Sequence, residues 1–195
     1  SIAISSCILE AILAAQQGVK CVSLGYAEQG NRVQDVATIK AMRSLATNHL
    51  DKSGYSDVQI NTIFNQYMAS FPPDLSHSEE LIFESAITAA ISGATRIITK
   101  SPVEHLKIPT MSDNLSGLEL VKDGIKRADN LDSLFDSNQY VSFLKAVEQE
   151  KEIIELEVNS IIDSIMQIGN GNVVGGIIKG FEKGYLDIPF SPSIY

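Results

Sequence analysis

Short apolar runs alternate along the chain with longer segments in which apolar residues recur every three or four positions. The runs with the length and β-branched content of strands are 19–24, 58–64 and 96–99. The segments with helical spacing around them are 8–17, 35–50 and 78–91. This alternation indicates βαβ units and a parallel sheet, and the short runs are typical of strands buried on both faces.

The pattern becomes helical after residue 110. Amphipathic spacing predicts a helix over 113–128, a long one over 140–168 and a last one over 173–183. Gly18 and Gly93 are placed to end helices, and Asp35 is placed to cap one. We therefore predict a single domain over 1–195, with βα units in 1–110 and a helical C-terminal part in 111–195.

Three strands are too few for an isolated parallel sheet, because both of its edges would expose unpaired backbone groups. A complete eight-stranded β/α barrel needs about 250 residues, whereas this chain has 195. The predicted fold class is α/β, as part of a (β/α)8 TIM-type barrel with additional C-terminal helices. We expect the sequence to be cut from a longer chain, or its sheet edges to be covered by a partner.

Charge and composition exclude several classes of protein. With 24 acidic and 15 basic residues the net charge is −9, which argues against a nucleic-acid partner. No run reaches the roughly 20 apolar residues that span a membrane. His49, His77 and His105 are too dispersed for a metal site, and we expect His49 and His77 to be at the surface. Cys7 and Cys21 lack CxxC spacing, which predicts buried, reduced thiols in a cytoplasmic protein.

Candidate chemistry lies in the segments that follow the predicted strands. The chain has no GxSxG, P-loop or HExxH motif, and Gly169-Asn170-Gly171 is typical of a helix stop. Lys100 follows the strand 96–99, and Glu104 lies four residues beyond. Lys can donate to ring nitrogens and Glu can accept from sugar hydroxyls, so the two could share a ligand's polar edge. On spacing alone, a capping box from Ser101 to Glu104 or a plain surface ion pair is favoured over a ligand site.

Two other post-strand segments are weaker candidates. Tyr67 and Phe71 offer flat apolar surface to a planar ligand, but aromatic residues here can also simply pack the loop. The segment 25–35 contains polar side chains that could touch a ligand, although turn chemistry accounts for most of them.

The order of short motifs along the chain points to a family. The motifs are Gln17-Gly18-Val19-Lys20, Gly25-Tyr26, Gly30-Asn31, Gln34-Asp35, Phe71-Pro72, Gly93-Ala94-Thr95, Lys100-x-Pro102-x-Glu104, Ile108-Pro109-Thr110, Gly180-Phe181-Glu182 and Asp187-Ile188-Pro189-Phe190. In this order they resemble the large (epsilon) subunit of glutamate mutase, also called methylaspartate mutase. The resemblance covers essentially all 195 residues.

The resemblance implies an isomerase built on a β/α barrel. Its mouth would receive adenosylcobalamin, carried by a separate small cobalamin-binding subunit, in a heterotetramer. The adenosyl radical would abstract hydrogen from L-glutamate, and migration of the glycinyl fragment would give 3-methylaspartate. The positions that match the family's coenzyme contacts are Phe71, Lys100, Glu104 and Ile108. Lys100 and Glu104 would hold the adenosyl ring and ribose, and Phe71 and Ile108 would form apolar walls.

Departures from the family pattern leave the substrate open. Asn65 and Tyr67 stand where the family has His and Trp, Ala69-Ser70 replaces Gly-Gly, and Val103 replaces His. A related cobalamin mutase acting on another acid, or a non-enzymatic barrel relative that serves in assembly, are the alternatives. In the family, the arginines that grip glutamate precede the position of Ser1. We therefore expect this segment to need the N-terminal half of its barrel and to have no turnover alone.

Overall fold

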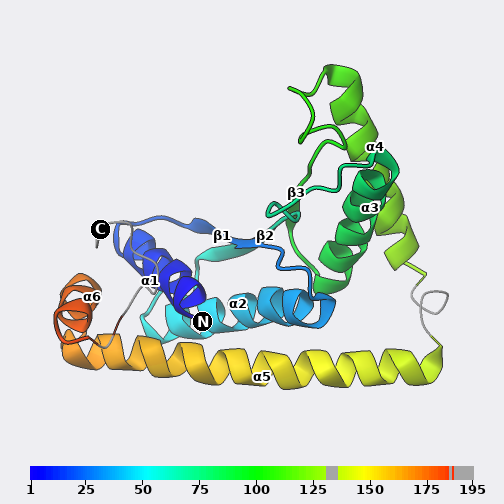
Figure 1. The fold of residues 1–195 in the computed structure, drawn as a ribbon. Helices are drawn as coiled ribbons and strands as arrows, with labels where there is room; N and C mark the ends of the chain where they lie inside the picture. The colour runs from blue at the N-terminus through cyan, green and yellow to red at the C-terminus, as the bar shows by residue number, and fades with distance from the viewer. Residues whose placement is uncertain (131–135, 185, 187–195) are drawn as a thin grey trace.

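Three strands and six helices make up the described part of the chain, which covers residues 1–130, 136–184 and 186 (Figure 1). In this computed structural model their order is α1 (Ile2–Gln16), β1 (Cys21–Ala27), α2 (Arg32–Lys52), β2 (Gln59–Asn65), α3 (Leu75–Ser92), β3 (Arg96–Ile98), α4 (Met111–Ala128), α5 (Ser137–Ile168) and α6 (Val173–Glu182). The predicted α/β class is confirmed. The proline-rich motifs after residue 186 lie outside the described residues.

The strands form one parallel sheet in the order β1-β2-β3. The β1–β2 pairing runs from Cys21 opposite Gln59 to Ala27 opposite Asn65, and β3 joins beside Ile63 to Asn65. Each strand therefore pairs with the next strand in the sequence. Because all three strands are parallel, the segments that leave β2 and β3 both start from the carboxyl end of the sheet.

One face of the sheet is covered and the other is largely open. Leu24 of β1 and Phe64 of β2 are buried on the helix side. Cys21, Ser23 and Gly25, which alternate with the buried positions, are exposed. The prediction of strands buried on both faces is therefore wrong for β1 in the described structure. The separate prediction of buried thiols is also wrong, since Cys21 is exposed and Cys7 is only half-buried.

Helix α5 lies along α2 and α1 and completes the main core (Figure 1). Its buried positions are Val147, Ile154, Val158, Ile162 and Ile165. His49 of α2 is covered by this helix, is only 5% exposed, and has its Nε2 2.8 Å from Asn159 Oδ1. The prediction of a surface His49 is wrong because nothing local in the sequence shows that a helix about 110 residues later lies over it.

Several helix ends differ from the predictions. Helix α1 begins at Ile2 rather than near residue 8. Helix α2 begins at Arg32, where Asn31 is the cap and its Oδ1 accepts from the Gln34 amide at 3.2 Å. The predicted cap, Asp35, is instead buried, and its Oδ1 accepts from the Tyr26 hydroxyl at 2.7 Å. The predicted stop at Gly93 is confirmed, because this residue adopts the left-handed conformation with φ of 71°.

The C-terminal helices agree closely with the sequence pattern. The helix stop after α5 is confirmed at Gly169, and Asn170 has a positive φ of 48°. Helix α4 begins at Met111 rather than at residue 113, because Thr110 and Asp113 form a capping box. None of the helices described here is long and apolar enough to cross a membrane.

Candidate functional site

Lys100 and Glu104 lie side by side just beyond the carboxyl end of β3. Lys100 Nζ and Glu104 Oε1 are 2.5 Å apart, and the two side chains are 17% and 40% exposed. The predicted juxtaposition of cation and carboxylate is therefore present, as an ion pair. Each group keeps further hydrogen-bonding capacity, because an ammonium has three donors and a carboxylate has two acceptor oxygens. A ligand with both donors and acceptors could bind here without breaking the pair.

The capping box predicted from Ser101 to Glu104 is absent. Residues 102–106 form successive turns rather than a helix. The Ser101 hydroxyl is buried, and within the described part of the chain it has no hydrogen-bond partner. The helix start that the sequence does encode lies later, at Thr110. Helix capping therefore does not explain why Glu104 stands four residues after Lys100.

Phe71 connects the loop after β2 to the loop after β3. Its ring stacks on that of His105, with centroids 5.9 Å apart and an interplanar angle of 29°. Its inner side packs against the cluster of Ile82, Ala86 and Val121. Ile108, farther along the second loop, is 92% exposed. The four predicted residues thus come from two loops at one sheet edge, with Phe71 partly packed and Ile108 free of the core.

Tyr67 packs against the loops around it, as the second of its two possible roles, loop packing, predicts. A Cβ added at Gly30 would lie 3.6 Å from the Tyr67 ring, so the ring covers the turn between β1 and α2. The Tyr67 amide donates to Glu28 Oε2 at 3.0 Å, and the Ser85 hydroxyl donates to the same oxygen. Burial raises the pKa of the Glu28 carboxyl, and the hydrogen bond from Ser85 acts against this rise.

Gln66 is the residue that sequence reasoning missed. It follows β2 directly, is 1% exposed, and its Nε2 donates to the Ile82 carbonyl at 2.9 Å. Its Oε1 accepts from the Lys100 amide at 2.9 Å and from the Thr99 hydroxyl at 3.0 Å. No local pattern indicates this role, because its partners lie 16 to 34 residues away.

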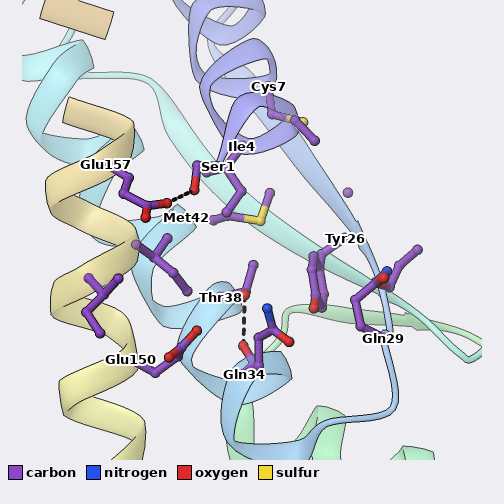
Figure 2. Close-up of a pocket in the computed structure, with 15 residues that line it drawn as sticks. Ser1, Ile4, Cys7, Tyr26, Gln29, Gln34, Thr38, Met42, Glu150 and Glu157 are labelled. Carbon is purple, nitrogen blue, oxygen red and sulfur yellow. Dashed lines mark hydrogen bonds between the residues drawn. The ribbon is translucent and has the colours of Figure 1, made fainter. Parts of the chain in front are cut away.

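A cavity of about 500 Å³ lies elsewhere, between α1, α2, α5 and the end of β1 (Figure 2). Its lining includes Tyr26, Gln29, Thr38, Met42, Glu150 and Glu157. None of the four predicted site residues lines it. Among the residues that the structure describes, no group of three or more His, Cys, Asp or Glu side chains could hold a metal ion. The cavity is instead lined by Gly25, Tyr26 and Gln29 of the third candidate segment, 25–35, whereas the charged pair and Phe71 lie on the loops after β2 and β3.

Fold and site define a parallel α/β protein with a charged pair and an aromatic residue on the loops at the carboxyl end of its sheet. The family model described as methylaspartate mutase E chain (MutE) matches residues 1–195. The chain belongs to this family.

Similar proteins carry a consistent name. The glutamate mutase epsilon subunit of Treponema denticola is 40% identical over 195 residues, which are 100% of this chain and 39% of that protein. The subunit from Escherichia coli O157:H7 is 38% identical over 189 residues, 97% of this chain and 38% of that protein. The one from Halobacterium salinarum is 36% identical over 193 residues, 99% of this chain and 38% of that protein. The chain thus spans well under half the length of these relatives.

Proposed function

We propose that the chain is the coenzyme-binding portion of the catalytic subunit of an adenosylcobalamin-dependent glutamate mutase. In this proposal the loops after β2 and β3 hold the adenosyl group. The observation that carries it is the Lys100–Glu104 pair at the carboxyl edge of a parallel sheet, in a chain that belongs to the methylaspartate mutase E family.

The order of the sheet supports a barrel. Three parallel strands that follow each other in sequence, with no reversal of order, are what successive βα units of a closed barrel produce. One half of a doubly wound sheet has the same order, so the barrel is proposed because the chain also belongs to the methylaspartate mutase E family. In the proposed (β/α)8 barrel, the open face bearing Ser23 and Gly25 would face the interior, and further strands would pair with β1 and β3.

The residues present fit an adenosyl group. The Lys100 ammonium can donate to a ring nitrogen, and the Glu104 carboxylate can accept from ribose hydroxyls. Phe71, on the loop after β2, and the exposed Ile108, on the loop after β3, supply apolar surface. When bound, adenosylcobalamin supplies radical chemistry through homolysis of its cobalt–carbon bond. The contribution of these side chains is to bind and orient the adenosyl end.

Substrate and partners belong to the whole protein. The relatives named glutamate mutase epsilon subunit make L-glutamate the proposed substrate and 3-methylaspartate the product. The word subunit in those names supports a second chain, which we propose to be the small cobalamin-binding subunit of a heterotetramer. A dicarboxylate needs bidentate basic clamps, which we place in the remainder of the protein.

The test is Glu104→Gln in the intact enzyme, reconstituted with the small subunit. Gln keeps the size of the side chain but loses the charge-assisted interactions, so adenosylcobalamin should bind about tenfold more weakly. The melting temperature without coenzyme should stay within a degree or two of the wild type, since Glu104 is on the surface. Equilibrium binding and thermal melting measure the two quantities.

Glu119→Gln is the matched control, because this exposed glutamate lies on α4 outside the two loops. It should leave coenzyme affinity unchanged. Equal affinity in wild type and Glu104→Gln, with equal melting temperatures, would refute the adenosyl-binding role. The products of the intact enzyme can be identified by NMR. If it converts another acid and not L-glutamate, the proposed adenosyl site still stands and the proposed substrate is wrong.

A further inference from the structure

Gln66 holds the backbone from which the Lys100 side chain starts. Its amide can satisfy its neighbours in only one orientation. The Ile82 carbonyl requires a donor and the Lys100 N–H requires an acceptor, so Nε2 faces Ile82 and Oε1 faces Lys100. The Gln66 backbone amide also donates to the Ile98 carbonyl at 3.2 Å. A single buried residue thus joins α3, the end of β3 and the loop after it.

Gly117 of α4 packs against the carbonyl group of the same residue, Lys100. A Cβ added at Gly117 would lie 2.4 Å from the Lys100 carbonyl oxygen and 3.6 Å from the Ser101 Cα. Real Cβ atoms do not approach a carbonyl oxygen so closely, so only glycine permits this contact. The N–H of Lys100 is therefore fixed by a hydrogen bond, and its C=O by close packing of a helix.

We infer that Gln66 and Gly117 are positioning residues for adenosylcobalamin, which act through the backbone of Lys100. This inference rests on the proposed function, because it assigns a purpose to a fixed Lys100. A flexible four-carbon side chain that must meet one ring atom gains from a rigid origin, because less of its freedom is lost on binding. Neither residue touches the coenzyme in this scheme.

A double-mutant cycle in the intact enzyme with its small subunit tests the role of Gln66. Lys100→Ala and Gln66→Met should each weaken adenosylcobalamin binding by about tenfold or more, since misplaced groups lose most of their effect. The double variant should bind no more weakly than Lys100→Ala, because Gln66 acts only through Lys100. Gln66→Glu keeps an acceptor for the Lys100 amide but loses the donor to the Ile82 carbonyl, so it should bind the coenzyme more tightly than Gln66→Met and more weakly than the wild type. If Gln66→Met fails to fold, Gln66→Asn takes its place in the cycle, because its shorter amide does not reach Lys100.

A pair of glycine variants tests the helix contact. Gly117→Ala should weaken coenzyme binding, whereas Gly124→Ala should lower the melting temperature at unchanged coenzyme affinity. Gly124 is the matched control because its added Cβ would also be too close to its neighbours, at 2.7 Å from the Phe83 carbonyl oxygen, but away from Lys100. Gly117→Ala strains the contact of α4 with the Lys100 backbone, whereas Gly124→Ala strains its contact with α3. A general loss of packing by α4 would therefore lower coenzyme affinity in both variants.

The outcomes separate this inference from the proposed function. If Lys100→Ala leaves coenzyme affinity unchanged, both fail. If Lys100→Ala weakens binding but the effects of Gln66→Met and Lys100→Ala multiply, Gln66 acts independently and the inference alone is overturned. Equal effects of Gly117→Ala and Gly124→Ala on affinity overturn it for Gly117.

Discussion

At the scale of single residues, two polar side chains, the half-buried Glu28 and the buried Gln66, hold the loops at the carboxyl end of the sheet together. Glu28 receives hydrogen bonds from the Tyr67 amide and the Ser85 hydroxyl, and so connects the turn after β1 to the loop after β2 and to α3. Gln66 makes the equivalent connection between β2, α3 and the loop after β3. Burial penalises the charged form of the Glu28 carboxyl, so its contribution to the free energy of unfolding depends on pH.

Glu28→Gln should change how stability varies with pH. Burial raises the folded-state pKa of Glu28 above its ordinary value of 4.5. The stability from protonated Glu28 is thus complete below the unfolded-state pKa and is lost as pH rises through the folded-state pKa. Gln keeps an acceptor for the Tyr67 amide but does not ionise. The melting temperature of the variant relative to that of the wild-type intact protein should therefore rise from about pH 4 to 7. A difference in melting temperature that stays constant with pH would contradict this.

Some of the candidate site could be predicted because it depends on local order. Lys100 follows a strand, and Glu104 follows at a spacing of four, so their proximity needs no distant contact. The bonds of Gln66 could not be predicted, because they depend on how α3 and the loop after β3 meet in space. The burial of His49 depends in the same way on α5, whose Asn159 lies 110 residues later.

At the scale of elements, α4 sets the position of the loop that carries Lys100 and Glu104. Its first turn is fixed by Thr110, whose hydroxyl accepts from the Asp113 amide while the Asp113 carboxylate accepts from the Thr110 amide. Lys107 adds an ion pair to Asp113 at 2.8 Å, and hydrogen bonding from Lys107 lowers the pKa of Asp113 to about 2. The helix pattern predicted this element well, but the cap lies three residues before the predicted start at 113.

Thr110→Ala should loosen the first turn of α4. Loss of a threonine cap costs about 1 kcal/mol, so amide hydrogens in this turn should exchange about fivefold faster in hydrogen–deuterium exchange. Asn114→Ala is the control, since this exposed residue lies in the same turn and alanine favours a helix. Faster exchange in both variants, or in neither, would show that the Thr110 cap does not hold the turn.

At the scale of the whole molecule, the described sheet has an open edge and an open face. β1 pairs only with β2 within the described part of the chain, so its other edge presents unpaired backbone groups. Exposed apolar side chains occur at the end of β3, on the loop after it and along α4, at Ile98, Leu106, Ile108, Met111, Leu115 and Leu118. The parallel pairing of the strands could be predicted from the alternation of strand and helix patterns. What covers the open face and the exposed apolar side chains could not, because local patterns do not show which distant residues pack there.

A protein consisting of residues 1–195 alone should therefore self-associate. An unpaired parallel strand and clustered apolar side chains favour edge-to-edge pairing and aggregation. Size-exclusion chromatography with light scattering should give masses above the 21.2 kDa of one chain, together with binding of a hydrophobic dye. Supplying the remainder of the epsilon subunit, which residues 1–195 do not cover, should suppress both signals, because the proposed barrel would then close. A monodisperse monomer of residues 1–195 that melts cooperatively would show that this sheet is stable with its edge uncovered, and the barrel proposal would lose its physical basis.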